Sequence, residues 1–254
     1  MLRRLWLTLS FAAGLIQTAA HAADPREDLY RQALHILGGN ASVIHKWSGS
    51  IRLIVVGAPQ MQPAARETLT EVAKIAGLSA EFPDAAIGSA NDYLTLLRNS
   101  APHSLASNCS PDPAAGRCFN FVVVFASSAQ MEQIAAAIPL PRHFQLGLQR
   151  AGATPCYFAP YIRARHEIYK AVVYIRDDLP PEMQRTCLAE EIYQAMGMFE
   201  DYSDSKYFSF NNQVQAKQIT AHDKALLRAL YDPRVRLGTP ANTVVRLFLE
   251  HHLP

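Results

Sequence analysis

Four side chains in the C-terminal half are spaced like the ligands and the catalytic base of a metal site. Glu190 and Gln194 are four residues apart, so on a helix their oxygens can reach one point. Glu191 would project to a neighbouring spot, and Glu200 follows the turn residue Gly197. In helices of the H-E-x-x-H type, two histidines at this spacing hold zinc and the intervening Glu activates water. The spacing therefore predicts metal-assisted hydrolysis, or the remains of such a site.

The longer metzincin pattern H-E-x-x-H-x-x-G-x-x-H matches residues 190–200 only in part. The general-base Glu, the Gly and the overall spacing are kept, and Glu200 stands at the position of the third ligand. Both histidines of the helix are replaced, by Glu190 and Gln194, whereas zinc sites use Cys, His and carboxylate. An all-oxygen set would suit calcium, magnesium or manganese better. We therefore expect no zinc, and a catalytic role for Glu191 only if the protein is active.

The same stretch is also typical of an ordinary half-exposed helix, which has one apolar and one polar stripe. At about 100° per residue, the polar stripe contains Met183, Cys187, Glu190 and Gln194, and the opposite apolar stripe contains Leu188, Ile192, Ala195 and Met196. Periodicity alone favours this simpler interpretation, in which the acids are merely solvated.

The N-terminus has the three parts of a secretory signal. Arg3 and Arg4 precede an apolar run over residues 5–16, and an A-x-A site ends at Ala22. The run is shorter than the roughly 20 apolar residues that span a bilayer. An uncleaved anchor or a buried helix is the alternative. We expect residues 1–22 to be removed, leaving an exported protein, periplasmic or secreted, without a membrane span.

The charge balance excludes some classes of partner. The sequence has 24 Lys and Arg residues against 22 Asp and Glu residues. Removing Arg3 and Arg4 with the signal peptide leaves 22 of each, so the mature chain is close to neutral. A nucleic-acid-binding surface needs a basic face, so we expect no nucleic-acid partner. No linker or repeat divides residues 23–254, which we treat as one domain.

Four cysteines behind a signal peptide indicate disulfide bonds. Four cysteines allow three connectivities. Cys109 with Cys118 is favoured because the pair brackets a turn-rich segment, and this leaves Cys156 with Cys187. The competing interpretation is a metal site, but no pair shows C-x-x-C spacing.

Hydrophobic periodicity and capping residues predict the elements that must position these side chains. Strands are expected at 51–56, 119–125 and 168–175, helices at 26–37, 63–76, 127–138, 181–196, 220–230 and 242–251, and an irregular crossing at 147–159. Thr220 and Asp223 have capping-box spacing, and Tyr231-Asp232-Pro233 should end a helix. Because the helices gather late in the chain, the order suggests an α+β fold.

Two runs carry a resemblance to a known family. C-L-A-E-E-I-Y-Q-A-M-G from Cys187 and D-K-A-L-L-R-A-L-Y-D-P-R-V-R-L-G from Asp223 resemble the bacterial family called domain of unknown function 2927, over residues 156–238. That family is grouped with zincin-like peptidase folds. The resemblance implies a single zincin-like domain of the metzincin type, with a twisted sheet and an active-site-like helix. It also implies the Cys156–Cys187 pair, and supporting positions for the motif at Gly197, Asp223, Tyr231, Asp232 and Gly238.

Three functions are compatible with these patterns. The first is a degenerate peptidase, or pseudopeptidase, whose cleft binds an extended peptide or an envelope protein, paired with the strand at 168–175. The second is an active hydrolase with an oxygen-ligated metal and Glu191 as the base. The third is a structural envelope component. We expect the acids Asp201 and Asp204 to lie in a solvated loop, with a calcium site as the alternative, and the histidines to be surface or cap residues rather than ligands.

Overall fold

The computed structural model describes residues 24–39, 42–83, 88–99, 119–137, 154–210 and 219–253. The predicted signal peptide, Cys109 and Cys118 lie outside these residues, so the Cys109–Cys118 bond stays a prediction. Within the described residues, no helix is long and apolar enough to cross a membrane.

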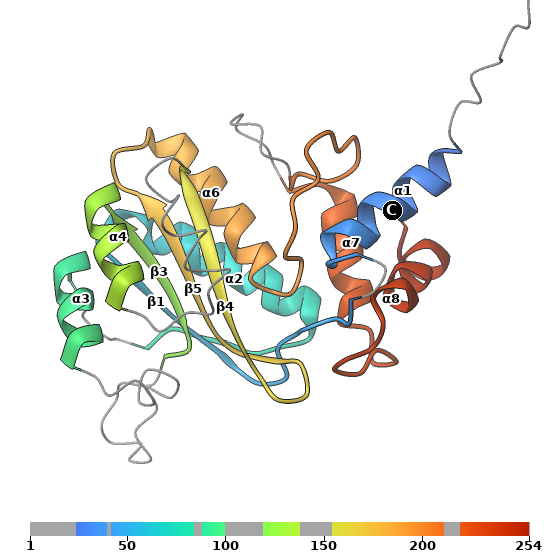
Figure 1. Cartoon of the computed structure of the whole chain (residues 1–254), viewed down its shortest axis with the longest axis horizontal. Coiled ribbons are helices and arrows are strands. Elements are labelled where there is room, and N and C mark those ends of the chain that lie inside the picture. Colours follow the sequence, from blue (N-terminus) through green and yellow to red (C-terminus); the bar gives the residue numbers. More distant parts are fainter. Residues whose placement is uncertain are drawn as a thin grey trace, which may run out of the picture.

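A five-stranded mixed sheet forms the centre of one half of the molecule, with the order β2-β1-β3-β5-β4 (Figure 1). The strands are β1 (Ile51–Val56), β2 (Ala80–Glu81), β3 (Phe121–Ala126), β4 (Cys156–Arg163) and β5 (Glu167–Arg176). Strand β4 runs antiparallel to β5, and the other neighbours are parallel.

Helices cover both faces of this sheet and form a second, helical half beside it (Figure 1). They are α1 (Pro25–Ile36), α2 (Gln62–Ala76), α3 (Ala90–Asn99), α4 (Ser128–Ala137), α6 (Pro181–Gln194), α7 (Ala221–Leu230) and α8 (Ala241–Leu247), with a 3-10 turn at Pro59–Met61 and a π-helical turn at Phe248–His252. Helices α3 and α4 pack on one face and α2 and α6 on the other. Helices α1, α7 and α8 pack against one another in the helical half.

The domain is therefore a mixed α/β structure, and the expected α+β class is correct only at this coarser level. The late helices do gather in the helical half. The earlier strands, however, alternate with helices, and this alternation produces a largely parallel sheet.

Local sequence signals explain most of the boundaries. Helix α2 ends at Gly77, which adopts φ 67°, a left-handed conformation that glycine reaches without strain. The predicted capping box of Thr220 and Asp223 is present at the start of α7. Every residue of β3 is buried because the strand lies inside the sheet with helices on both faces.

The sequence patterns missed β2, α3 and β4. The expected irregular crossing at 147–159 is wrong from Cys156 onward, where β4 begins. Pro160 lies within this strand, and a proline argues against a strand in the interior of a sheet. Strand β4 tolerates it because β4 lies at the edge.

The strand expected to pair with a peptide is also corrected. Residues 168–175 fall within β5, and β5 is bonded to β3 on one side and β4 on the other. An interior strand has no free backbone groups for an added strand. Among the described residues, β4 is paired only with β5, so the edge next to α6 belongs to β4.

Candidate functional site

The C-terminal half of α6 is buried on nearly all sides, unlike its N-terminal half. Pro181, Glu182 and Arg185 are exposed, whereas every residue of the stretch 191–198 is buried. Glu191 is 6% exposed and Gln194 is 3% exposed. The interpretation of this stretch as a half-exposed helix is therefore wrong where the motif lies. Polar residues at these positions need a specific partner or a specific role.

Glu191 is a buried carboxyl group, and its Oε2 has no hydrogen-bond partner among the described residues. Burial raises the pKa of Glu191 well above its usual value, and the nearby charges of Glu190 and Asp201 raise it further. The buried environment therefore favours the neutral form of Glu191 more than water does. A group in this state can donate a proton more readily than it can accept one.

Asp201, in the loop that follows α6, is a second acid of this region, and its charge acts on Glu191. Its Oδ1 accepts a hydrogen bond from Nε2 of Gln194. Burial raises the pKa of Asp201, and the charge of Glu200 raises it further, while the Gln194 hydrogen bond and His35 oppose this shift. The expectation of a solvated loop is thus wrong for Asp201, whereas Asp204 is exposed.

Strand β4 also carries Tyr157, whose ring packs with the residue cluster of α3 and α4 on the other face of the sheet. Burial raises the pKa of Tyr157, and the charges of Glu191 and Glu200 raise it further. Glu200 is exposed and Glu190 is half-buried. The ionised acids of this region create a negative potential beside the sheet edge.

The turn after α6 is fixed by the segment that joins the two halves. The indole Nε1 of Trp47 donates to the carbonyl oxygen of Ala195 at 3.0 Å. The hydroxyl of Tyr231 donates to the carbonyl oxygen of Met196 at 2.9 Å and accepts from the backbone N–H of Trp47 at 3.1 Å. Gly197 has φ 114°, and a Cβ there would overlap the carbonyl oxygen of His45. Gly197 is therefore required by a close backbone approach.

The remaining motif residues lie in the helical half and have structural contacts. Asp223 accepts hydrogen bonds from the backbone N–H of Thr220 at 2.6 Å and the hydroxyl of Ser209 at 2.7 Å. Asp232 accepts from Arg234 and lies 3.2 Å from Nε2 of His252. These aspartates hold the loop and the helix ends in place, and they do not belong to the group around Glu191.

Gly238 lies in a turn against the end of the β4–β5 hairpin. It has φ 75°, and a Cβ there would come within 2.8 Å of Cδ2 of His166. Its backbone N–H donates to the carbonyl oxygen of Ile44 at 3.3 Å. Gly238 therefore supports the junction between the two halves.

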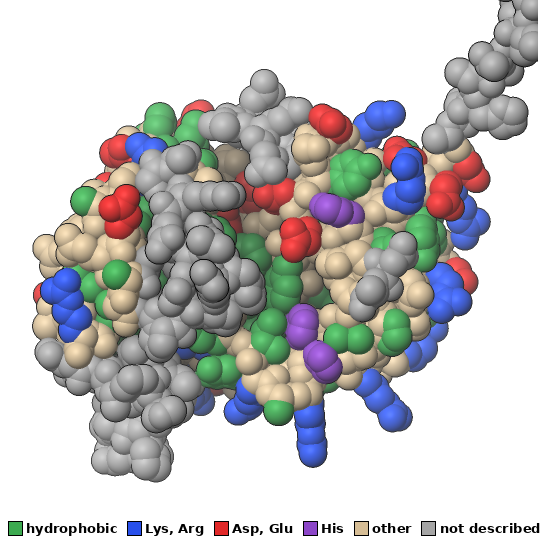
Figure 2. Space-filling view, in the orientation of Figure 1, with side chains coloured by type: hydrophobic (Ala, Val, Ile, Leu, Met, Phe, Trp, Pro, Cys, Tyr) green, Lys and Arg blue, Asp and Glu red, His purple; other side chains and the backbone are tan. Residues whose placement is uncertain are grey.

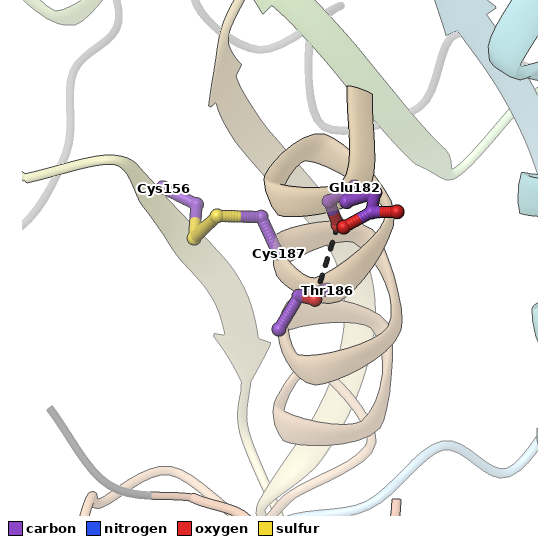
Figure 3. The surroundings of a disulfide bond; sticks show 4 residues. All are labelled: Cys156, Glu182, Thr186 and Cys187. Atoms are coloured by element: carbon purple, nitrogen blue, oxygen red, sulfur yellow. Dashed lines mark hydrogen bonds between the residues drawn. A yellow bond between two sulfur atoms is a disulfide. The ribbon is translucent and has the colours of Figure 1, made fainter. Parts of the chain in front are cut away.

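A disulfide bond links Cys156 at the start of β4 to Cys187 in the middle of α6 (Figure 3). The predicted pair is thus present. The bond crosses from the edge strand to the helix that carries Glu190 and Glu191, so it fixes the distance between the sheet edge and the acids.

The donor set at the motif does not fit zinc. Within the described residues, no three His, Cys, Asp or Glu side chains come together closely enough to hold a metal ion. The amide of Gln194 is engaged with Asp201, and Glu200 is exposed. We therefore derive no chemical step through a metal.

Aromatic rings lie beside the acids. The rings of Phe158 and Phe199 are 5.8 Å apart, and the ring of His45 stacks on Phe199 at 5.8 Å. His45 also lies 5.0 Å from His166, and its buried Nδ1 has no hydrogen-bond partner. Both histidines are half-buried. In Figure 2, acidic and histidine side chains gather between the sheet half and the helical half.

The sequence alone predicted Glu190, Glu191, Gln194 and Glu200 as site residues, but its motif did not include Asp201. Asp201 could have been found from its position seven residues after Gln194, but only if the chain was known to turn back at Gly197.

These features define a mixed α/β domain in which a cluster of acids lies beside an edge strand. The sequence matches the family described as "Protein of unknown function (DUF2927)" over residues 27–249. The chain belongs to this family, as its resemblance indicated. No curated protein and no solved structure gives a significant match.

Proposed function

We propose that this protein is an exported, zincin-like pseudopeptidase that binds an extended peptide segment, or an extended part of an envelope protein, along β4. The observation that carries the proposal is the edge of β4 beside the acids on α6. An added strand gains main-chain hydrogen bonds from such an edge, and its alternate side chains provide specificity.

The hydrogen-bond register identifies the backbone groups on this edge. The N–H of Arg176 in β5 donates to the carbonyl oxygen of Pro155 at 3.0 Å. Bonded and non-bonded pairs alternate along an antiparallel ladder. The pairs Cys156↔Ile175 and Phe158↔Val173 are therefore non-bonded. The N–H and C=O groups of Cys156 and Phe158 point away from β5, toward an added strand.

Pro160 agrees with this register. It pairs with Ala171, whose N–H donates instead to the carbonyl oxygen of Asn120 at 2.9 Å. A proline at this position loses no ladder bond, since its missing N–H would have pointed away from β5. The edge therefore offers donors at Cys156 and Phe158 and an acceptor at Pro160.

The alternative, a hydrolase that uses Glu191 as a base, has less support. A base must be ionised to accept a proton, and burial raises the pKa of Glu191. The metal content of the mature protein, purified without chelators, tests this alternative by plasma mass spectrometry. A stoichiometric metal that is lost in a Glu190→Ala, Glu200→Ala variant would restore the hydrolase. We expect no such metal.

Hydrogen exchange tests the binding proposal directly. The probe is a set of labelled peptides of about six residues with alternating Val and Thr, which favour the extended state. On peptide addition, the amides of Cys156 and Phe158 should exchange more slowly, whereas the amide of Ala159, which faces β5, should not change. The matched control is the same peptide N-methylated at alternate residues, which cannot complete the ladder. Equal binding of the two peptides, or no protection at Phe158, would contradict edge-strand binding.

A further inference from the structure

We propose that the segment bound at β4 presents a lysine or arginine side chain to the carboxylates of Glu191, Glu200 and Asp201. This inference rests on the proposed edge-strand binding and adds the chemistry of the bound segment. Its support comes from the direction of the side chains at the edge, the charge of the acids and the aromatic rings beside them.

The two faces of β4 determine where a bound side chain would point. Phe158 packs in the same core cluster as the buried apolar residues of α6, such as Leu188 and Ile192. Ala159 belongs to the other cluster, with the residues of α3 and α4. Side chains alternate between faces along a strand. Every second side chain of an added strand would therefore lie on the face of α6, next to the acids.

The charge at this place is negative, and within the described residues no lysine or arginine is among the groups that shift the pKa values of Glu191 and Asp201. The groups that shift the pKa values of Glu191 and Tyr157 are burial and neighbouring carboxylates. Among the described residues, the His35 ring acts on the carboxyl group of Asp201 in the opposite direction and lowers its pKa. Lysine and arginine bring permanent positive charge and several N–H donors.

Glu191 provides a second, independent observation. Its Oε2 is buried and has no hydrogen-bond partner, and its side chain is 6% exposed. A buried polar atom without a partner costs free energy unless a ligand or water satisfies it. A donor from a bound ammonium or guanidinium group would satisfy this oxygen and would also favour the ionised carboxylate.

Aromatic residues on the α6 face complete a site for a long basic side chain. Phe199 is half-buried, and its ring lies 5.8 Å from the ring of Phe158. Lysine and arginine bury their aliphatic stems on apolar surfaces and keep the charged end in a polar environment. Their charged ends are also attracted to the faces of aromatic rings.

Fluorescence anisotropy with three versions of the Val/Thr peptide tests the inference. In the first set, the central residue is lysine, norleucine or glutamate. In a second set, the same residue is placed one position further along the peptide, so that its side chain lies on the other face of the added strand. We expect the lysine peptide to bind about tenfold more tightly than the norleucine peptide in one of the two sets. This difference should shrink when the ionic strength is raised above about 0.15 M, since salt screens the charges.

Charge-neutral variants locate the effect on the protein. Glu200→Gln and Asp201→Asn should each reduce the preference for lysine over norleucine severalfold. The matched control is Glu132→Gln on α4, an exposed position on the opposite face of the sheet, which should leave the preference unchanged.

The outcomes separate the two proposals. Equal binding of the lysine and norleucine peptides in both sets, with the N-methylated control still weaker, would overturn the basic side chain but retain edge-strand binding. A preference for lysine that survives in Glu200→Gln and Asp201→Asn would place the cation elsewhere and also overturn the inference. If no peptide binds, both proposals fail.

Discussion

Two groups of buried acids differ in how completely they are partnered. In the helical half, Asp223 accepts hydrogen bonds from Thr220 and Ser209. Beside the sheet edge, Glu191 keeps an oxygen without a partner, and Asp201 accepts from Gln194. Asp223 and Glu191 belong to the motif that the sequence suggested, whereas Asp201 does not, and the two motif acids have different roles. The partnered Asp223 stabilises the fold, and the unpartnered Glu191 is the acid to which we assign the bound side chain.

Partnered and unpartnered acids should also change the stability of the fold in opposite directions when the pH changes. Asp232 has a lowered pKa, mainly because the side chain of Arg234 donates hydrogen bonds to it. Ionised Asp232 therefore stabilises the fold at a pH above the pKa that it has in the unfolded chain, and this stabilisation is lost as the pH falls. Glu191 has a raised pKa, so its effect has the opposite sign. Lowering the pH should therefore remove the stabilisation that Asp232 provides, and it should reduce the cost of burying an ionised Glu191.

The largest expected effect concerns the partnered acid. Asp223→Ala should destabilise the protein by about 4 kcal/mol, because it leaves buried donors of Ser209 and Thr220 unsatisfied and removes a helix cap. Urea unfolding measures the change. The exposed Asp204→Ala in the neighbouring loop is the control and should stay within about 0.5 kcal/mol of wild type. If both variants unfold alike, Asp223 is not the structural acid that its contacts indicate.

The next effect concerns the link between the edge strand and the acids. Replacing both Cys156 and Cys187 with alanine should cost about 3 kcal/mol, because the bond closes a loop with a sequence separation of 31 residues. Urea unfolding of the oxidised wild type and the double variant measures this cost.

The same double variant tests whether the link positions the site. Peptide affinity at β4 should fall in the variant under conditions where it remains folded. Unchanged affinity in the folded variant would show that the acids and the edge keep their relative position without the bond.

A smaller effect concerns the unpartnered acid. Because the folded pKa of Glu191 is raised above the usual 4.5, the unfolded state loses its proton first. Wild type should therefore lose stability as the pH rises above about 4.5, by up to about 1.4 kcal/mol per pH unit for one proton. Glu191→Gln removes this contribution, so its stability should depend less on pH than that of wild type.

Urea midpoints between about pH 5 and about pH 8 measure this difference. Asp201 has a raised pKa as well, so some dependence should remain in the variant. Glu67→Gln on the exposed surface of α2 should follow the wild-type curve. Parallel curves for wild type and Glu191→Gln would show that Glu191 is ionised in the folded state.

The smallest effect on stability is expected at the exposed member of the acidic site. Glu200→Gln should change the free energy of unfolding by less than about 0.5 kcal/mol, because Glu200 is exposed. Urea unfolding checks this. A large loss of stability would assign Glu200 to the fold and remove the distinction between the two groups of acids.

The sequence by itself determined the elements that have strong local signals. The apolar runs of β1, β3 and β5, the end of α2 at Gly77 and the capping box of Asp223 were predictable, since each depends on neighbouring residues. The Cys156–Cys187 bond and the family were also indicated before the fold was known.

Only the tertiary structure decided which polar residues are buried and which strand is at the edge. Periodicity reports the two sides of a helix, but it cannot show that a second layer covers the polar side. The stretch 191–198 is buried because the segment around Trp47 and the helical half close over the end of α6. Strand order arises from pairings between distant segments, so the edge position of β4 among the described strands and the approach of Asp201 to Glu191 could not be deduced from local patterns.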